Sequence, residues 1–376
     1  MTGEFCGANL RVARHFHALT LEELAEQVGK TRQYLFKLET GASTPTESLA
    51  GDLAKALEVE PEFFLVPPLP PLPEEQVHFR RLLTTKVGIR QVALAKAQVT
   101  QLLVAYCDQK LKLPPVQFDE HVARSAENIE VAAEQTRRAW GLSTGPIANI
   151  TRLAENAGAV VTTFQGVSRE VDALSVPGSR PLVVINSDTK SPCRTRFDIG
   201  HEIGHFVLHQ GQVTGDRVTE SEANRFASAL LMPRTTFIKE FPVTRSGRIR
   251  WAELSDLKLR WLTSKAAMVM RARSLGLIDD HGVKSAFIRL KNSGESIKEI
   301  EDDQIPFEVP EILVMAMDIL KTRLSIDARQ TAKDLRVQPS LVGKLLPVAQ
   351  KQNQQIATVI DFPTAKFRRP GYRVGS

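Results

Sequence analysis

The chain has 376 residues, which is enough for two or three domains that each bury a hydrophobic core. Its 42% hydrophobic and 24% charged residues are ordinary for a globular protein, and no apolar run reaches the ~18 residues of a membrane span. Three widely spaced cysteines argue against a disulfide framework and a thiolate zinc cluster. The net charge of +6 permits nucleic-acid binding, and the lack of a signal-peptide pattern predicts a cytoplasmic protein with no membrane partner.

The N-terminal segment has the pattern of short helices without strands, and residues 20–39 have the layout of a helix-turn-helix. Ala25 is the small residue that permits a close helix crossing, and Gly29 makes the turn. Thr20 and Thr31 are expected to cap the second and third helices. The sequence therefore predicts a compact all-α domain over residues 1–65.

This segment resembles the DNA-binding domains of Cro/CI-type repressors (the XRE family) over residues 8–65. The resemblance rests on the turn, on a Leu-Glu-x-Gly sequence and on a leucine-rich helix, which are Ala25, Gly29, Leu38–Gly41, Pro45 and Leu53–Leu57. It implies binding to a double-stranded DNA operator, pairing of Arg14 with Glu39, and a homodimer, because palindromic half-sites suit such readers.

The start of the third helix is expected to enter the major groove. There Arg32 and Gln33 can form bidentate hydrogen bonds to base edges, while Lys30 and Lys37 contact phosphates and Thr31 caps the helix between them. Helix-turn-helix packing also occurs in proteins that never touch DNA, so docking of another protein stays an alternative.

Five prolines in Val66–Pro73 predict a stiff extended linker over residues 66–75. Beyond it, helices are expected over 76–112 and 122–140. Three short β-rich runs then predict a small sheet, at Ala159–Phe164, Val171–Val176 and Pro181–Asn186. The expected fold class is therefore mainly α with a small β-sheet (α+β).

His201 and His205 enclose Glu202 in a His-Glu-x-x-His sequence. On a helix, side chains four residues apart lie one turn apart on the same face, so both imidazoles can bind one Zn²⁺. Glu202 then lies beside the ion and is the expected catalytic general base for peptide-bond hydrolysis. A third ligand is expected on the helix that follows. Glu220 and Glu222 flank opposite edges of its buried stripe, so periodicity does not choose between them.

Around these residues the sequence resembles the ImmA/IrrE family of zinc metallopeptidases, across most of residues 76–280. The motifs are Arg-Phe-x-x-x-His-Glu-x-Gly-His-x-x-x-His at 196–209 and Glu-x-Glu-Ala-Asn-x-Phe-Ala-x-x-Leu-Leu-Met-Pro at 220–233. The resemblance implies a minimal thermolysin-like (gluzincin) fold, in which Glu222, before Ala-Asn, is the third zinc ligand.

Arg196 and His209 are candidates to stabilise an oxyanion or to support the metal ligands from behind. Leu182–Ile185 could pair with an extended substrate if it forms a sheet edge. Residues 281–376 are expected to form a helical subdomain that ends in a basic tail, with a degenerate second helix-turn-helix at 325–346 as the alternative.

Together these features predict a DNA-binding transcriptional regulator with a zinc endopeptidase domain. The resemblance implies that its substrate is a helix-turn-helix repressor, or the chain itself, cut in response to a signal. The alternative is an antitoxin-like or sensor transcription factor whose metal domain is a non-catalytic scaffold. A third possibility is a protease whose N-terminal module docks the substrate repressor.

Overall fold

The computed structural model describes residues 4–72, 78–79, 87–123, 125–164, 173–186, 191–244 and 247–347, with backbone alone at 78–79. It is mainly helical with one small sheet, which confirms the expected fold class. Among the described residues, no helix is both long enough and apolar enough to cross a membrane. The end of the expected linker and the basic tail lie outside the described residues.

The N-terminal domain folds around a core of leucine and phenylalanine side chains. Its elements are α1 (Gly7–Phe16), α2 (Leu21–Gln27), α3 (Arg32–Glu39), α4 (Glu47–Ala56) and the 3₁₀ helix η1 (Pro61–Phe64). Thr20 forms the expected capping box with α2, and Thr31 accepts a hydrogen bond from the first turn of α3. The buried guanidinium of Arg14 donates to both carboxylate oxygens of Glu39, at 2.6 and 3.0 Å, which confirms that pairing.

A four-stranded sheet lies at the centre of the molecule in the order β1-β3-β4-β2. Its strands are β1 (His78–Phe79), β2 (Val160–Phe164), β3 (Ala173–Val176) and β4 (Leu182–Asn186). β2 is parallel to β4, and β3 is antiparallel to both β4 and β1. The three β-rich runs thus form strands where expected.

Two local expectations are wrong. Leu182–Ile185 is not at an edge, because β4 pairs with β3 on one side and with β2 on the other. A helix does not begin at residue 76, because His78–Phe79 is a strand and helix α5 (Val87–Lys110) begins at Val87. Strand pairing with a segment far along the chain overrides the local pattern there.

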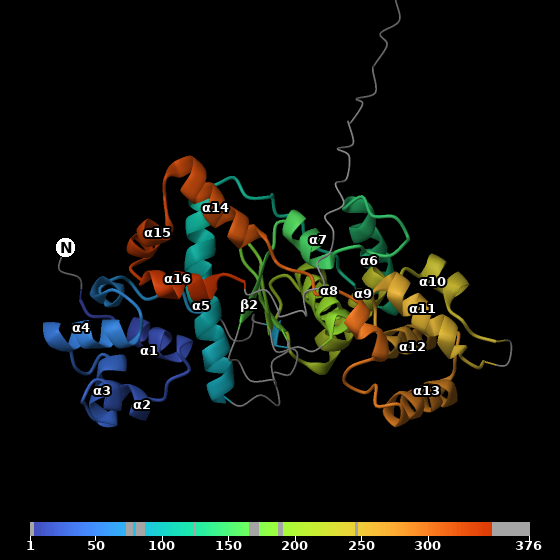
Figure 1. Cartoon of the computed structure of the whole chain (residues 1–376), viewed down its shortest axis with the longest axis horizontal. Coiled ribbons are helices and arrows are strands. Elements are labelled where there is room, and N and C mark those ends of the chain that lie inside the picture. The colour runs from blue at the N-terminus through green and yellow to red at the C-terminus, as the bar shows by residue number, and fades with distance from the viewer. Residues whose placement is uncertain are drawn as a thin grey trace, which may run out of the picture.

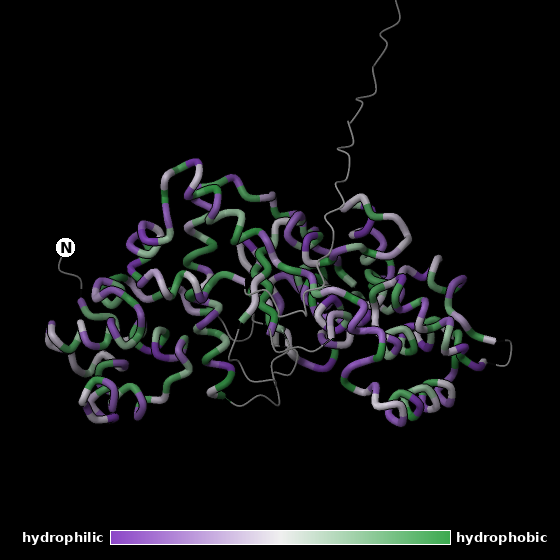
Figure 2. The backbone as a smooth tube through the Cα atoms, in the orientation of Figure 1, coloured by the Kyte–Doolittle hydropathy of each residue, from purple (hydrophilic) through white to green (hydrophobic). Residues whose placement is uncertain are grey.

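The sheet is covered on both faces (Figure 1). In β4, Val183 and Ile185 pack toward α8 (Pro192–Leu208), whereas Leu182 and Val184 pack toward α5 and α14 (Ile312–Leu324). This alternation with both faces buried explains why the strand reads as a continuous apolar run. Figure 2 shows the same clustering of hydrophobic residues on the strands.

The remaining helices form two groups. The first group lies around α8 and consists of α6 (Ala126–Ala139), α7 (Ile150–Asn156), α9 (Arg217–Leu231), α10 (Arg234–Glu240), α11 (Trp251–Trp261), α12 (Lys265–Ser274) and α13 (Asp280–Asn292). The 3₁₀ helix η3 (Ile300–Gln304) is tied to α11, where buried Lys258 pairs with Glu299 at 2.7 Å and Asp302 at 2.6 Å.

The C-terminal elements return to the N-terminal domain (Figure 1). α14, α15 (Ala328–Leu335) and α16 (Pro339–Leu345) share a hydrophobic core with α1, α4 and α5. Val59 and Val337 form an isolated antiparallel bridge, and the Gln338 amide donates to the Glu58 carbonyl at 2.8 Å. The expected helix pair at 325–346 is present, and it packs as a support for the N-terminal domain. The domain boundaries themselves stay a prediction.

Candidate metal centre and nucleic-acid interface

The two histidines lie on α8, which is buried along most of its length. The helix starts where sequence predicts a start, because Ser191 accepts a hydrogen bond from Arg194 and Pro192 occupies the first position. His201 and His205 are each 1% exposed, and their Nε2 atoms lie 3.0 Å apart. Both imidazoles therefore turn the same nitrogen toward one point, as two ligands of a single ion would.

The carboxylate that completes this group is that of Glu220 on α9. Its two oxygens lie 3.3 Å from Nε2 of His201 and 3.4 Å from Nε2 of His205. These three residues form the one set of three possible metal ligands found among the described residues. The expected third ligand, Glu222, is not in this set, because its carboxylate lies against His209 instead.

The face that α9 turns toward α8 explains this choice. Residues 220, 224 and 227 follow one another at helical spacing on that face. Glu222 comes two residues after Glu220 and, at about 100° per residue, projects roughly 200° round the helix from it. Asn224 supports Glu220 as the third ligand, because its Oδ1 lies 3.1 Å from Nδ1 of His201. A partner on Nδ1 fixes the ring and leaves Nε2 free to bind a metal. Sequence reasoning missed Asn224, although its position one turn after Glu220 was the available signal.

His209 and Glu222 form a second support behind His205. Nδ1 of His209 lies 3.0 Å from Nδ1 of His205, and Nε2 of His209 lies 2.9 Å from Glu222. One proton must lie between the two Nδ1 atoms, so His205 can donate to His209, which in turn donates to the Glu222 carboxylate. The chain of contacts orients His205 in the way that Asn224 orients His201.

The charges of the cluster suit a cation. Burial lowers the pKa of His205 to about 4, so its imidazole is neutral at physiological pH, the form that binds metals. Burial alone would raise the pKa of Glu220, but the imidazoles of His201 and His205 beside it hold that pKa below its ordinary value. Two imidazoles and one carboxylate are a donor set that fits Zn²⁺ with one position left open.

Glu202 is 1% exposed and lies on α8 under the sheet. The hydroxyl of Ser175, on β3, donates a hydrogen bond to Oε2 of Glu202. This contact joins the metal helix to the strand above it, and Ser175 could not be found from sequence because 27 residues separate the partners.

Arg196 does not serve as an oxyanion donor. It follows the helix about 140° away from His201, and its buried guanidinium pairs with Glu308 and donates to the Leu262 carbonyl at 3.0 Å. Its function is to tie α8 to the segment before α14.

Close packing of α8 on α9 brings the ligands together. A Cβ on Gly204 would lie 3.2 Å from the Cα and the carbonyl oxygen of Ala223, and one on Gly200 would lie 3.4 Å from Cβ of Ala227. Glycine is needed at 204 because the backbone of the neighbouring helix occupies that space.

The residues expected to read DNA lie on α3 and just before it. Lys30, Thr31, Arg32, Gln33 and Lys37 are all exposed. Arg32 forms an exposed ion pair with Glu22, at 2.7 Å, which a phosphate or a base could replace at little cost. Beside them Phe36 is 56% exposed, an apolar side chain that the sequence analysis did not single out.

Two known families match separate parts of the chain. Residues 17–64 match the helix-turn-helix family, and residues 154–272 match the family described as IrrE N-terminal-like domain, a peptidase family. The chain joins these two kinds of domain. The match supports a DNA-binding regulator with a metallopeptidase-like domain.

No curated protein matches the chain. Among solved structures, ComR from Streptococcus suis covers 88% of this chain and 85% of its own, at 13% identity and a TM-score of 0.15. These values are too low for the likeness to carry an argument about fold or function.

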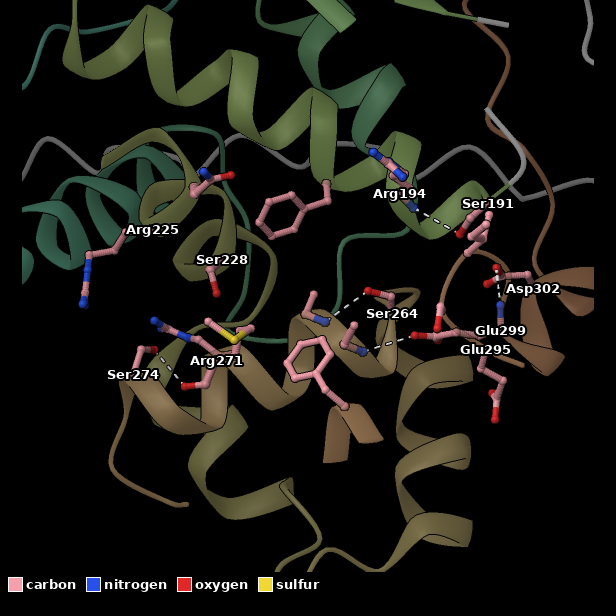
Figure 3. Close-up of a pocket in the computed structure, with 18 of the residues that line it drawn as sticks. Ser191, Arg194, Arg225, Ser228, Ser264, Arg271, Ser274, Glu295, Glu299 and Asp302 are labelled. Atoms are coloured by element: carbon pink, nitrogen blue, oxygen red, sulfur yellow. Dashed lines mark hydrogen bonds between the residues drawn. The ribbon is translucent and has the colours of Figure 1, made fainter. Parts of the chain in front are cut away.

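A cavity of about 520 Å³ lies next to Asn224, the residue that contacts His201, and Figure 3 shows residues that line it. Phe197 lines it one helical turn before His201, and Asn224 lines it while contacting His201. Phe287 and the stretch 295–302 close the opposite side and lie beyond the matched residues 154–272. Part of the wall of this cavity is therefore supplied by the C-terminal third of the chain.

Proposed function

We propose that the protein is a transcriptional regulator that binds an operator through α3 and acts as a zinc-dependent endopeptidase on a helix-turn-helix repressor in response to a signal. In this proposal it works in the cytoplasm as a homodimer, whose two copies of α3 read two half-sites of the operator. The observation that carries the catalytic part is the convergence of His201, His205 and Glu220 beside Glu202.

His201, His205 and Glu220 would hold Zn²⁺, with Asn224 and His209 fixing the two imidazoles. The ion would act as a Lewis acid on the scissile carbonyl. Glu202 takes the proton of the attacking water and passes it to the leaving amine nitrogen. Ser175 positions the Glu202 carboxylate by its hydrogen bond.

The test compares the wild-type protein with Glu202→Gln. Each is assayed for metal content, then incubated with a repressor encoded next to it. We expect one zinc per chain in both proteins and cleavage by the wild type alone. Equal cleavage by both proteins would remove Glu202 as the base, and absence of zinc would overturn the metal site.

A second function is favoured by the burial of the group. His201, His205 and Glu202 are each 1% exposed, as they would be in a structural site. In that case the chain is an antitoxin-like or sensor transcription factor with a non-catalytic metal domain. Zinc without cleavage in either protein would select this function.

A further inference from the structure

The outer edge of β3 is the part of the sheet nearest to the proposed general base. β3 pairs with β4 along one edge, and its Ser175 donates a hydrogen bond to Glu202. α8 packs directly against both strands. A chain that paired with the other edge of β3 would therefore run alongside the metal group.

Extended peptides commonly bind proteins by adding a strand to an open sheet edge. In this sheet β4 is paired on both sides. β2 packs against α14, and its Thr162 hydroxyl donates a hydrogen bond to the Leu345 carbonyl. Of the described strands, β3 is the one that combines an outer edge with a contact to the metal helix. The geometry of the site thus directs strand addition to β3.

The protein's own chain already occupies this edge. β1 pairs antiparallel with β3, with His78 opposite Ser175 and Phe79 opposite Leu174. β1 lies between the proline-rich linker and α5, so it belongs to the segment that joins the helix-turn-helix domain to the rest of the chain. The residue opposite His78 is the same Ser175 that contacts Glu202.

The described part of β1 pairs with two of the four residues of β3, and a peptide that pairs with all four makes more main-chain hydrogen bonds. The advantage of β1 over a separate peptide is covalent attachment, because attachment gives a segment an effective concentration in the millimolar range. A longer peptide that makes more contacts along β3 can therefore displace it.

We propose that the chain's own segment at His78–Phe79 closes the outer edge of β3 in the resting state, and that this segment must leave before an extended segment of the substrate protein pairs there. The inference rests on the proposed peptidase function for the identity of the incoming chain. Occupation of the edge by β1 is independent of that function.

The experiment uses the full-length, metal-loaded protein with Glu202→Gln, so that nothing is cleaved. The probe is a fluorescein-labelled peptide with the sequence of residues 74–83, Glu-Glu-Gln-Val-His-Phe-Arg-Arg-Leu-Leu. Its binding is measured by fluorescence anisotropy to this parent and to the same protein carrying His78→Pro and Phe79→Pro. Proline lacks the amide hydrogen that strand pairing needs.

We expect the peptide to bind the proline variant at least ~10-fold more tightly than the parent, since the competing segment has been removed. A variant with His78→Ala and Phe79→Ala keeps the amides and should bind like the parent. A peptide with proline at the same two positions should not bind. Equal binding to parent and proline variant, or no binding to either, would overturn the proposal.

Hydrogen exchange supplies a readout that needs no peptide. The amides of β3, residues 173–176, should exchange faster in the proline variant than in the parent, while those of α8 stay protected, which also shows that the variant is folded. Unchanged exchange in β3 would mean that β1 does not cover the edge.

Cleavage then separates this proposal from the proposed function. With Glu202 restored, the proline variant should cut the repressor several-fold faster than the wild type. If the wild type cuts but the variant is no faster, the edge is not the substrate site. If neither protein cuts while the binding and exchange results hold, the peptidase function fails and occupation of the edge by β1 stands.

Discussion

Replacing Gly204 with alanine tests whether the close crossing of α8 and α9 sets the metal group. The new Cβ would lie 3.2 Å from the Cα and the carbonyl oxygen of Ala223, and 3.2 Å from a ring carbon of Phe226. Backbone atoms cannot rotate away as a side chain can, so α9 must shift by a few tenths of an ångström. Overpacking of this kind costs about 1–3 kcal/mol, and the higher helix propensity of alanine returns ~1 kcal/mol. The expected net loss in the free energy of unfolding is about 0–2 kcal/mol.

Gly200→Ala is the matched control on the same helix. Its nearest neighbour would be Cβ of Ala227 at 3.4 Å, which is an ordinary contact. This variant should keep its stability or gain up to ~1 kcal/mol from helix propensity.

The assays are chemical denaturation for stability and competition with a chelator for zinc affinity. Because Glu220 is carried by α9, Gly204→Ala should weaken zinc binding about tenfold or more, within the range for groups that orient ligands. Gly200→Ala should bind zinc as the wild type does. The reasoning is refuted if the two variants are equally stable and bind zinc equally well.

Three further changes test other parts of the molecule. Glu220→Gln should reduce zinc affinity by more than the roughly 100-fold that is the upper range for residues that only support a ligand, whereas Glu222→Gln should reduce it by about 10–100-fold. Chelator competition measures both losses, and the reverse ranking would restore Glu222 as the ligand. Arg32→Ala with Gln33→Ala should reduce operator preference by ~1–3 kcal/mol per lost base contact in a binding assay with matched and mutated operators, and unaltered preference would reject α3 as the reader. Burial raises the pKa of Glu155 to about 7, above its unfolded value. The stability that depends on its neutral form is therefore present below pH ~4.5 and is lost as the pH rises to ~7, and this loss in the free energy of unfolding reaches up to ~3 kcal/mol. Denaturation at several pH values should show this loss in the wild type and not in Glu155→Gln.

Much of the site could be predicted because its signals are local. The spacing of His201 and His205 fixes both imidazoles on one helix face whatever surrounds the helix. In the same way the caps at Thr20 and Thr31 depend on residues three positions away, and the apolar runs of the sheet require no partner to be recognised. These elements have the structure that their own sequence favours.

The choice between Glu220 and Glu222 could not be made in this way, because it depends on how α9 is rotated against α8. That rotation is set by the contact of Gly204 with Ala223, between two segments whose own patterns allow either carboxylate. Ser175 and Asn224 were missed for the same reason, since each acts on a residue of another element.

The proline-rich linker suggests a helix-turn-helix domain on a separate tether, but the packing of α5 argues otherwise. Ala95, Val99 and Leu103 on one side of α5 share the core of the N-terminal domain, while Ala97 and Val104 on the other side pack against the sheet. The start of the linker is held as well, because the buried Asn9 side chain bonds to the backbone of residues 66, 67 and 69.

A single helix therefore contacts both the DNA-reading domain and the sheet that carries Ser175. β1 lies on the chain between the linker and α5. When the N-terminal domain is bound to an operator, α5 therefore holds the sheet, and with it the edge of β3, in a fixed direction relative to the DNA. A substrate repressor bound at an adjacent operator would then meet that edge at a high local concentration, as any tethered pair does. On this argument, DNA with adjacent operators for the two proteins should accelerate cleavage of the repressor, and DNA with one operator should not.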